Sequence, residues 1–267
     1  MIKEYLTYIK SVKGLTENSV KAYAQDFRQF VCWAQAQQIR WSTLSRNDVD
    51  NYLLFMDRVG LSAATRCRRI SALRQLCQWA HHKGLLSMNP FQYAQSPKKA
   101  HKLPQTIDKA VLLQYLETPA ITQRSIYIHA LVALLYDTGI RIQEAIEIRW
   151  DDVNTLEHSI LIHGKGRKER KVYYTQRIIP HVGKVATIRK GYMLPMDCQY
   201  LWRKMLHEEI AGLHPHMIRH TFASDMLNAG ASLECVSALL GHESIKTTQI
   251  YAALNNNSLR AAYHQFH

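Results

Sequence analysis

Residues 214–223 read His-Pro-His-Met-Ile-Arg-His-Thr-Phe-Ala, and residues 239–251 read Leu-Leu-Gly-His-Glu-Ser-Ile-Lys-Thr-Thr-Gln-Ile-Tyr. The two segments place two histidines, an arginine and a late tyrosine in an order and spacing that chance rarely supplies: His216, Arg219, His242 and Tyr251. His216 and Arg219 share one face of a predicted helix because they are three positions apart. A phenol such as Tyr251 can form a covalent ester with phosphate and later leave it.

An upstream segment, Thr138-Gly-Ile-Arg-Ile-Gln-Glu144, supplies a second arginine. A planar guanidinium engages two phosphate oxygens at once, and Glu144 lies one turn after Arg141, where it can hold that guanidinium in place. Two such groups, Arg141 and Arg219, can stabilise the charge that develops on phosphorus in a transition state. This residue set suits attack on a phosphodiester by a phenolic oxygen without a metal ion.

A glycine-flanked lysine, Lys165, lies in the turn Gly164-Lys-Gly166 between two predicted strands. Glycine permits close approach of the backbone to a ligand, so Lys165 could donate a proton to the departing 5′ oxygen. Arg167 and Lys168 lie in the same turn and compete for this role, and we also count both as candidate DNA contacts. His242 could donate a hydrogen bond to the scissile phosphate. His220 is expected to be a structural histidine.

The periodicity of apolar residues predicts a mainly α-helical protein with a small antiparallel β-sheet. Four amphipathic helices are expected within residues 2–94, with Thr16 capping the second and Ser45 beginning the third. A segment with two prolines and no apolar period separates a helical domain, 1–97, from residues 104–267 through a linker at 98–103. The β section is a hairpin of residues 159–163 and 170–174. Helices are then expected at 126–137, 217–228, 233–240 and 245–253, with Gly241 ending the third of these, and unplaced helices within 176–212.

The composition limits the kinds of molecule that the protein is expected to bind. The chain has 267 residues and a formal net charge of +13, with a pI of about 9.6. Such a charge attracts polyanions, with an affinity that falls steeply as salt rises, but it does not choose among DNA, RNA and anionic membrane. The five cysteines form no Cys-x-x-Cys pair, which argues against a zinc site or a disulfide framework. Without a signal sequence or an apolar span, a soluble cytoplasmic protein is expected.

The last of the four helices expected within residues 2–94 carries four arginines within nine residues. Apolar neighbours already explain that helix, and a charge cluster is often only a solvated face. The density of guanidinium groups nevertheless favours contact with DNA phosphates. The residues assigned to this role are Arg66, Arg68, Arg69 and Arg74.

Four segments, taken in order, resemble the motifs of the tyrosine recombinases, also called the phage integrase family. They are residues 138–144, 164–166, 214–223 and 239–251. The similarity covers most of residues 104–255 and includes the basic run after Lys165. It is weaker in the N-terminal domain, where it is limited to the opening of a helical DNA-clamping domain at Leu15-Thr-Glu-Asn-Ser-Val-Lys-Ala-Tyr23. The resemblance implies a helical, SAM-like core-binding domain joined to a mixed α/β catalytic domain.

The resemblance also implies a mechanism. Tyr251 would attack a DNA strand, form a 3′-phosphotyrosyl link and free a 5′ hydroxyl. A hydroxyl from a partner duplex would reverse the step. The bond energy would be held in the covalent link, so no nucleotide cofactor is needed, and the two arginines would stabilise the transition state without a metal. The implied partners are double-stranded DNA with paired binding sites, a homotetramer on two duplexes and possible accessory DNA-bound proteins, with no membrane.

Several functions remain open at this point. The leading hypothesis is a site-specific recombinase that resolves multimers or integrates and excises a mobile element. The compact chain, without an extra arm-binding domain, favours the Xer-like or plasmid-resolvase type. The alternatives are a type IB topoisomerase-like enzyme that relaxes DNA, and a non-catalytic DNA-binding regulator. RNA or membrane binding has only the net charge in its favour.

Overall fold

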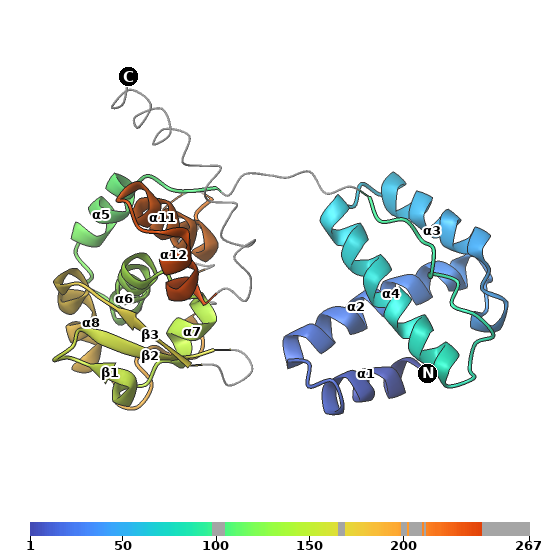
Figure 1. Ribbon diagram of the computed structural model, residues 1–267, viewed down its shortest axis with the longest axis horizontal. Helices are drawn as coiled ribbons and strands as arrows, with labels where there is room; N and C mark the ends of the chain where they lie inside the picture. The colour runs from blue at the N-terminus through green and yellow to red at the C-terminus, as the bar shows by residue number, and fades with distance from the viewer. Residues whose placement is uncertain (98–104, 165–168, 199–201, 203–209, 211, 242–267) are drawn as a thin grey trace, which may run out of the picture. The chain divides into compact units, whose positions relative to one another are not determined.

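The computed structural model describes residues 1–97, 105–164, 169–198, 202, 210 and 212–241. The chain forms two units, Met1–His101 and Lys102–His267. Both units are mainly helical, and a small antiparallel sheet belongs to the second (Figure 1). Within the described part of the chain, every helix is too short or too polar to cross a membrane.

The N-terminal unit is built from four α-helices, as the periodicity predicts: α1 (Ile2–Ser11), α2 (Glu17–Ala36), α3 (Arg46–Arg58) and α4 (Ala63–His82), with the short 3-10 helix η1 (Trp41–Thr43) before α3. The predicted N-caps are confirmed. The Thr16 hydroxyl accepts a hydrogen bond from the backbone N–H of Ser19 at 3.3 Å. Ser45 forms a capping box with Asp48, in which each side chain accepts from the other's backbone N–H. Such caps satisfy the first N–H groups of a helix.

Aromatic side chains fill the core of this unit. Tyr5, Phe27, Phe30, Tyr52 and Phe91 are all fully or almost fully buried. The rings of Phe30 and Tyr52 meet edge to face with centroids 4.9 Å apart, a geometry that aromatic quadrupoles favour. The N-terminal unit therefore has a hydrophobic core of its own.

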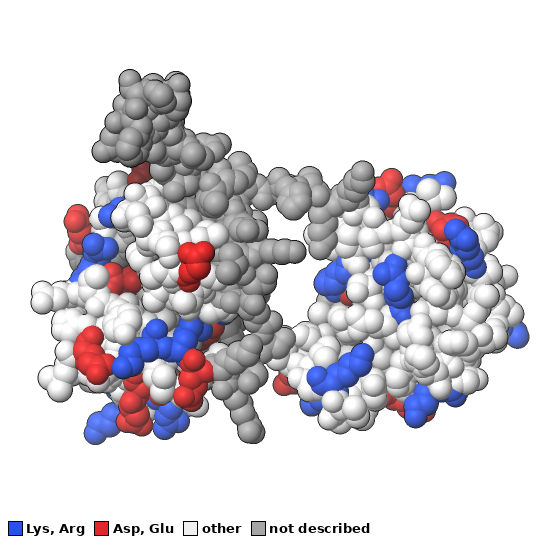
Figure 2. All heavy atoms as spheres, viewed as in Figure 1, with Lys and Arg blue, Asp and Glu red and all other residues white. Residues whose placement is uncertain are grey.

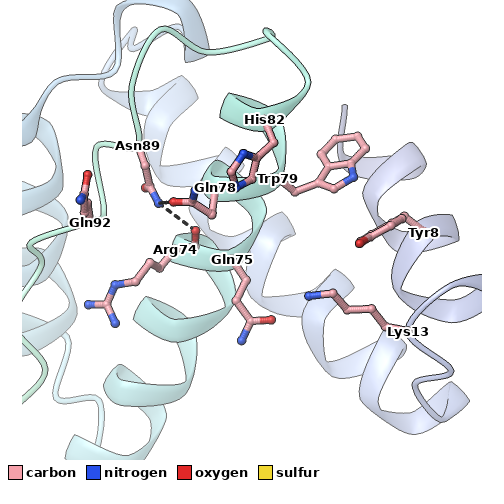
Figure 3. A pocket seen from close by; sticks show the side chains of 9 residues that line it. All are labelled: Tyr8, Lys13, Arg74, Gln75, Gln78, Trp79, His82, Asn89 and Gln92. Atoms are coloured by element: carbon pink, nitrogen blue, oxygen red, sulfur yellow. Dashed lines mark hydrogen bonds between the residues drawn. The ribbon is translucent and has the colours of Figure 1, made fainter.

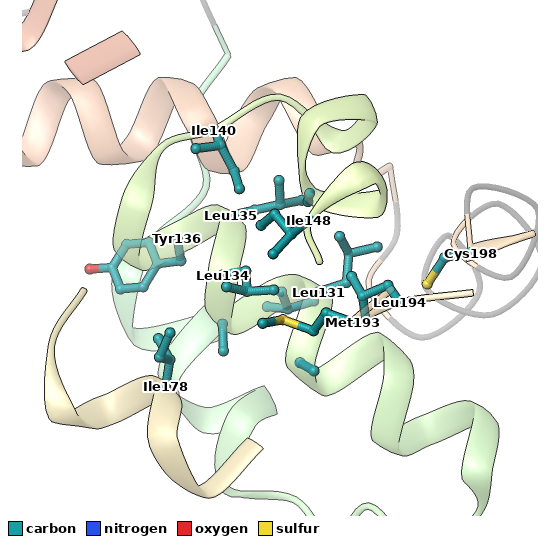
Figure 4. Packing of buried hydrophobic residues seen from close by; sticks show 14 of the residues in the cluster. Leu131, Leu134, Leu135, Tyr136, Ile140, Ile148, Ile178, Met193, Leu194 and Cys198 are labelled. Carbon is teal, nitrogen blue, oxygen red and sulfur yellow. The ribbon is translucent and has the colours of Figure 1, made fainter. Parts of the chain in front are cut away.

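The C-terminal unit is organised around one buried helix, α6 (Gln123–Thr138). The helix is apolar on nearly all sides, which is the pattern of a helix enclosed by other elements. Figure 1 shows α5 (Lys109–Glu117), α11 (Pro215–Asn228) and α12 (Leu233–Leu240) on one side of α6 and the sheet with α8 (Ile179–Ala186) on the other. Figure 4 shows Leu131, Leu134 and Leu135 of α6 in one cluster with Ile148 and Met193.

Along the described part of the chain, six further elements follow α6 and precede α8. They are α7 (Ile142–Glu147), the 3-10 helix η2 (Trp150–Asp152), strands β1 (Val153–Asn154), β2 (Ser159–His163) and β3 (Glu169–Tyr173), and the 3-10 helix η3 (Gln176–Ile178). The predicted hairpin is confirmed, with β2 and β3 antiparallel. The strand β1, which pairs with β2 and completes the order β1-β2-β3, was not predicted from the sequence. Two residues are too few to show the alternation that marks a strand.

Register and burial show which face of the hairpin meets the core. Ile160 pairs with Val172 and Ile162 pairs with Arg170. Both isoleucines and the valine are buried, so Arg170 lies on the same, inward face of the sheet. Lys171, the next residue, is exposed on the opposite face.

Candidate active site

Arg141 is placed by the way α6 ends. Gly139 follows the helix in the left-handed region, with φ of +65°, and its N–H binds the Leu135 carbonyl. The chain then turns into α7, whose N-cap is Arg141. Glu144 accepts the backbone N–H of Arg141 on Oε2 at 2.8 Å and the side-chain Nη1 on Oε1 at 2.8 Å. The contact between Glu144 and Arg141 expected from their spacing is therefore present.

Arg219 reaches the same region from α11. It is only 4% exposed, and its Nη1 donates to the Gly139 carbonyl at 2.7 Å. Its Nη2 donates to the Leu240 carbonyl, also at 2.7 Å. One helical turn further along α11, the Phe222 ring packs against Gly139 so closely that a Cβ at position 139 would lie 2.2 Å from Cδ1. The two arginine segments of the sequence thus meet at the end of α6.

A third arginine, Arg170 of β3, joins this cluster and was not among the predicted site residues. Its Nη1 and Nη2 donate to the two oxygens of Glu144 at 3.0 and 2.7 Å, and its Nε donates to the Leu239 carbonyl at 2.9 Å. A signal for it exists in the sequence. The segment Glu169-Arg-Lys-Val-Tyr173 alternates, and Val172 must face the core, so Arg170 faces inward as well. An arginine at an inward strand position needs a buried partner.

The three guanidinium groups converge on the C-terminal end of α12. Arg170, Arg219 and Arg141 bind the consecutive carbonyls of Leu239, Leu240 and Gly241, the last at 3.3 Å. A helix leaves its final carbonyls without intrahelical partners, and its C-terminus carries a partial negative charge. Three cations therefore stabilise the point at which α12 ends. Gly241 ends that helix with φ of +62°, as the sequence predicts.

The charge of Glu144 follows from these contacts. Burial disfavours its ionised form, but hydrogen bonds from Arg170 and Arg141 outweigh that effect and lower the pKa of Glu144 to about 2. The carboxylate is thus ionised throughout the physiological range. It offsets part of the positive charge of two guanidinium groups and fixes their orientation.

His216 lies on α11 near the same cluster. It is exposed at the surface of the unit, and partial desolvation lowers its pKa, followed by repulsion from Arg219, His214 and Arg141. His216 is therefore mainly neutral at pH 7 in the protein without DNA, and a neutral imidazole donates one hydrogen bond. The ring centroid of His220 lies 6.4 Å from that of His216, and burial lowers the pKa of His220 to about 4.

The structure brings Arg141, Glu144 and Arg219 together, with His216 beside them. The remaining predicted catalytic residues, Lys165, His242 and Tyr251, lie outside the described residues, as do Arg167 and Lys168 and the helix expected at 245–253. Within the described ranges, we find no group of three or more His, Cys, Asp or Glu side chains that could hold a metal ion.

The four arginines expected to contact phosphate all have partners within the N-terminal unit. Arg66 pairs with Asp57, and Arg68 pairs with the buried Asp26. Arg69 lies 3.5 Å from Asp26, and Arg74 donates to the carbonyls of Phe91 and Ala94. These contacts link α4 to α2, to α3 and to the segment that follows α4, and they do not test phosphate binding. Arg68, whose side chain is 46% exposed, has the most surface left for a ligand.

A cavity of about 380 Å³ lies in the N-terminal unit. Figure 3 shows Arg74, Gln75, Gln78 and Trp79 of α4 on one side of it, with Tyr8 and Lys13 opposite. All the lining residues belong to this unit, whereas Arg141, Glu144 and Arg219 belong to the other. The cavity is therefore not part of the arginine cluster, and we assign it no ligand.

Basic side chains of the described residues are dispersed over the face shown in Figure 2. On the face shown in Figure 2, Lys and Arg side chains are scattered over the N-terminal unit and alternate with acidic groups on the C-terminal unit. On this face, general attraction of a polyanion would come from dispersed charges.

The sequence and the fold define a family. The phage integrase family matches residues 105–258, and the N-terminal SAM-like domain of phage integrases matches residues 2–84. The chain belongs to the phage integrase family.

Among its relatives is the tyrosine recombinase XerD of Staphylococcus haemolyticus, which is 31% identical over 100% of this chain and 98% of the relative. The XerD of Staphylococcus aureus strain N315 is 30% identical with the same coverage. The fold is similar to that of the XerH site-specific recombinase bound to palindromic difH substrate in a post-cleavage complex, with a TM-score of 0.76 and 19% identity over 98% of this chain and 84% of that chain. It is also similar to a lambda integrase (75–356) dimer bound to a COC′ core site, with a TM-score of 0.73 and 16% identity over 94% and 93% of the chains.

Proposed function

We propose that this protein is a site-specific DNA recombinase that cleaves and rejoins strands through a 3′-phosphotyrosyl intermediate at Tyr251. One observation carries the proposal. Arg141 and Arg219, far apart in sequence, bind the carbonyls of Gly241 and Leu240 at the end of α12. The next residue in the chain is His242, and Tyr251 follows in the same segment. This arrangement supports two guanidinium groups acting on the phosphate that the tyrosine attacks.

The proposed reaction is a phosphoryl transfer. The phenolic oxygen of Tyr251 loses its proton to the surrounding water and bonds to phosphorus, and the bond from phosphorus to the 5′ oxygen breaks as Lys165 supplies a proton to that oxygen. Arg141 and Arg219 stabilise the charge on the non-bridging oxygens, with hydrogen bonds from His216 and His242. Attack by a 5′ hydroxyl of a partner strand on the phosphotyrosyl link then releases Tyr251. The bond energy is kept in that link, so ligation needs no nucleotide.

Two findings favour recombination over relaxation of DNA by a type IB topoisomerase-like enzyme. Relatives of this chain are named tyrosine recombinase XerD, and solved structures of similar fold are complexes with DNA. A working assembly would be a homotetramer on two duplexes with paired sites, with accessory DNA-bound proteins as a further possible requirement. The expected compartment is the cytoplasm, where the DNA substrate is found. The five cysteines are unpaired, which agrees with a reducing compartment.

A nicked suicide duplex tests the proposal. A short strand beyond the cleavage point diffuses away after cleavage, so the covalent protein–DNA adduct accumulates and is seen as a shifted band on a denaturing gel. A random-sequence pool of such duplexes would supply the site, read by sequencing the trapped DNA. We expect the adduct with wild type and none with Tyr251→Phe, which removes only the nucleophilic oxygen.

Adduct in the Tyr251→Phe variant would place the nucleophile elsewhere. DNA binding by wild type without any adduct would support the regulator instead. Two-site substrates separate recombination from relaxation, because a recombinase yields strand-exchanged products and a relaxing enzyme acts on a supercoiled plasmid without paired sites.

A further inference from the structure

Arg170 is a charged side chain on the inward face of a strand. Its side chain is only 15% exposed, and it pairs across the hairpin with the buried Ile162. A buried charge is costly unless it is paired and hydrogen-bonded. Arg170 meets this requirement through Glu144 and the Leu239 carbonyl, both of which also belong to the candidate active site.

One guanidinium therefore joins three segments that are separate in the sequence: strand β3, helix α7 through Glu144, and the end of α12 through Leu239. Glu144 receives a fork from Arg170 while it holds both the backbone and the side chain of Arg141. Displacing Glu144 would consequently displace Arg141. Displacing the Leu239 carbonyl would move the point from which the chain continues to His242.

We propose that Arg170 is a positioning residue for strand cleavage: through Glu144 it aims the guanidinium of Arg141, and through the Leu239 carbonyl it sets the end of α12. The inference rests on the proposed function. Arg170 touches neither substrate nor leaving group in this role, and it acts only through the groups that it holds.

The geometry requires arginine at this position. Binding both oxygens of a carboxylate and a carbonyl from one side chain needs the planar fork with its additional Nε–H, which the single ammonium of lysine does not provide. The site is also closely packed. A Cβ at Gly241 would lie 3.0 Å from Cζ, Nε and Nη1 of Arg170, so the backbone of the α12 C-cap approaches the guanidinium directly.

The adjacent residue supplies a matched control. Lys171 also forms an ion pair at 2.7 Å, with Glu157, but on the exposed face of the same strand. Replacing Lys171 tests loss of a charge and an ion pair from β3 without touching the arginine cluster. The comparison of Arg170→Lys with Lys171→Met therefore shows whether a change in cleavage comes from the buried position of the Arg170 guanidinium or from the loss of a positive charge on β3.

The experiment measures the single-turnover rate of adduct formation on the nicked duplex recovered by trapping, together with the DNA dissociation constant and the thermal unfolding midpoint. For Arg170→Lys, which keeps the charge, we expect cleavage to slow by about 100-fold, the order of magnitude that a displacement of about 1 Å produces. DNA affinity should stay within a few-fold of wild type. Lys171→Met should cleave at the wild-type rate.

Two further measurements show through which groups Arg170 acts on cleavage. Glu144→Gln should show a similar loss, and the double variant should be little worse than either single variant, because the two residues act as a unit. A duplex with sulfur in place of the bridging 5′ oxygen needs no proton for its leaving group. The Arg170→Lys defect should persist on this substrate, whereas a Lys165→Ala defect should be relieved.

Each outcome decides the inference. Cleavage by Arg170→Lys at the wild-type rate would overturn it, as would relief of the defect by the sulfur substrate, which would place the effect at Lys165. If Arg170→Lys unfolds, as its melting curve would show, wild-type cleavage by Glu144→Gln would overturn it. Absence of any Tyr251-dependent adduct with wild type would instead refute the proposed function.

Discussion

Gly139 combines two demands that only glycine meets. Its φ of +65° lies in the left-handed region, and the Phe222 ring occupies the space that a Cβ would need. We expect Gly139→Ala to lower the free energy of unfolding by about 3 kcal/mol, from backbone strain together with overpacking. Urea denaturation would measure this. Strand cleavage should fall as well, because the Gly139 carbonyl binds Arg219.

Gly230 is the matched control for this prediction. It has a φ of +91°, and a Cβ there would meet nothing within 4 Å. Gly230→Ala should therefore lower the free energy of unfolding by about 1 kcal/mol, which comes from backbone strain alone. Equal losses in the two variants would show that Phe222 moves aside at no cost and that packing against Gly139 does not hold Arg219 in place.

At the scale of elements, we expect the packing of α6 against α8 to make the C-terminal unit sensitive to acid. His129 of α6 is 3% exposed and lies beside His181 of α8, with ring centroids 5.9 Å apart. Burial, followed by repulsion from His181 and Lys184, lowers the pKa of His129 to about 4. The folded protein therefore holds this histidine neutral at pH values where the unfolded chain, with a pKa of about 6.5, takes up a proton.

Stability consequently falls as the pH decreases from about 6.5 toward 4, because the unfolded state binds the extra proton. At pH 5 the contribution of His129 to this loss is about 2 kcal/mol. His129→Gln keeps a polar group near Thr118 and removes the titration. We expect the difference in unfolding free energy between pH 7.5 and 5 to shrink by that amount, measured by urea titration at each pH. An unchanged difference would show that His129 is already charged in the folded state.

Helices and strands could be predicted from the sequence where a few neighbouring residues determine them. The spacing of apolar residues and the caps at Thr16, Ser45 and Gly241 identified seven helix positions and the hairpin, since each depends on a few neighbouring residues. The two-residue strand β1 and the short elements η3 and α8 within residues 176–212 were missed or left unplaced. Their length and their pairing depend on the neighbours against which they pack.

At the scale of the whole molecule, the residues that the structure describes form two large, separate hydrophobic cores. The N-terminal core draws its buried residues from α1 to α4 and the segment up to Phe91, all within the first unit. We expect a fragment of residues 1–101 to fold by itself and to unfold in one cooperative thermal transition, followed by circular dichroism. Its aromatic core should provide most of the stability.

Phe30→Ala in the same fragment serves as the control. The residue is 1% exposed and contacts Tyr52, so its removal should cost about 3–5 kcal/mol and abolish or strongly lower the transition. A wild-type fragment without a cooperative transition would show that the first unit depends on the second for its stability. The predicted domain limits, 1–97 and 104–267, would then need revision.

The sequence by itself determined seven of the helices with the caps at Thr16, Ser45 and Gly241, the hairpin, and the motifs around Arg141 and Arg219 that the phage integrase family shares. These features depend on residue types at short, regular spacings, which can be read along one chain. Only the tertiary structure decided that Arg141, Arg170 and Arg219 bind three successive carbonyls at the end of α12, with Glu144 between two of them. Every residue has a backbone carbonyl, so a guanidinium bound to one leaves no signature in the residue types, and the partner is chosen by how the elements pack.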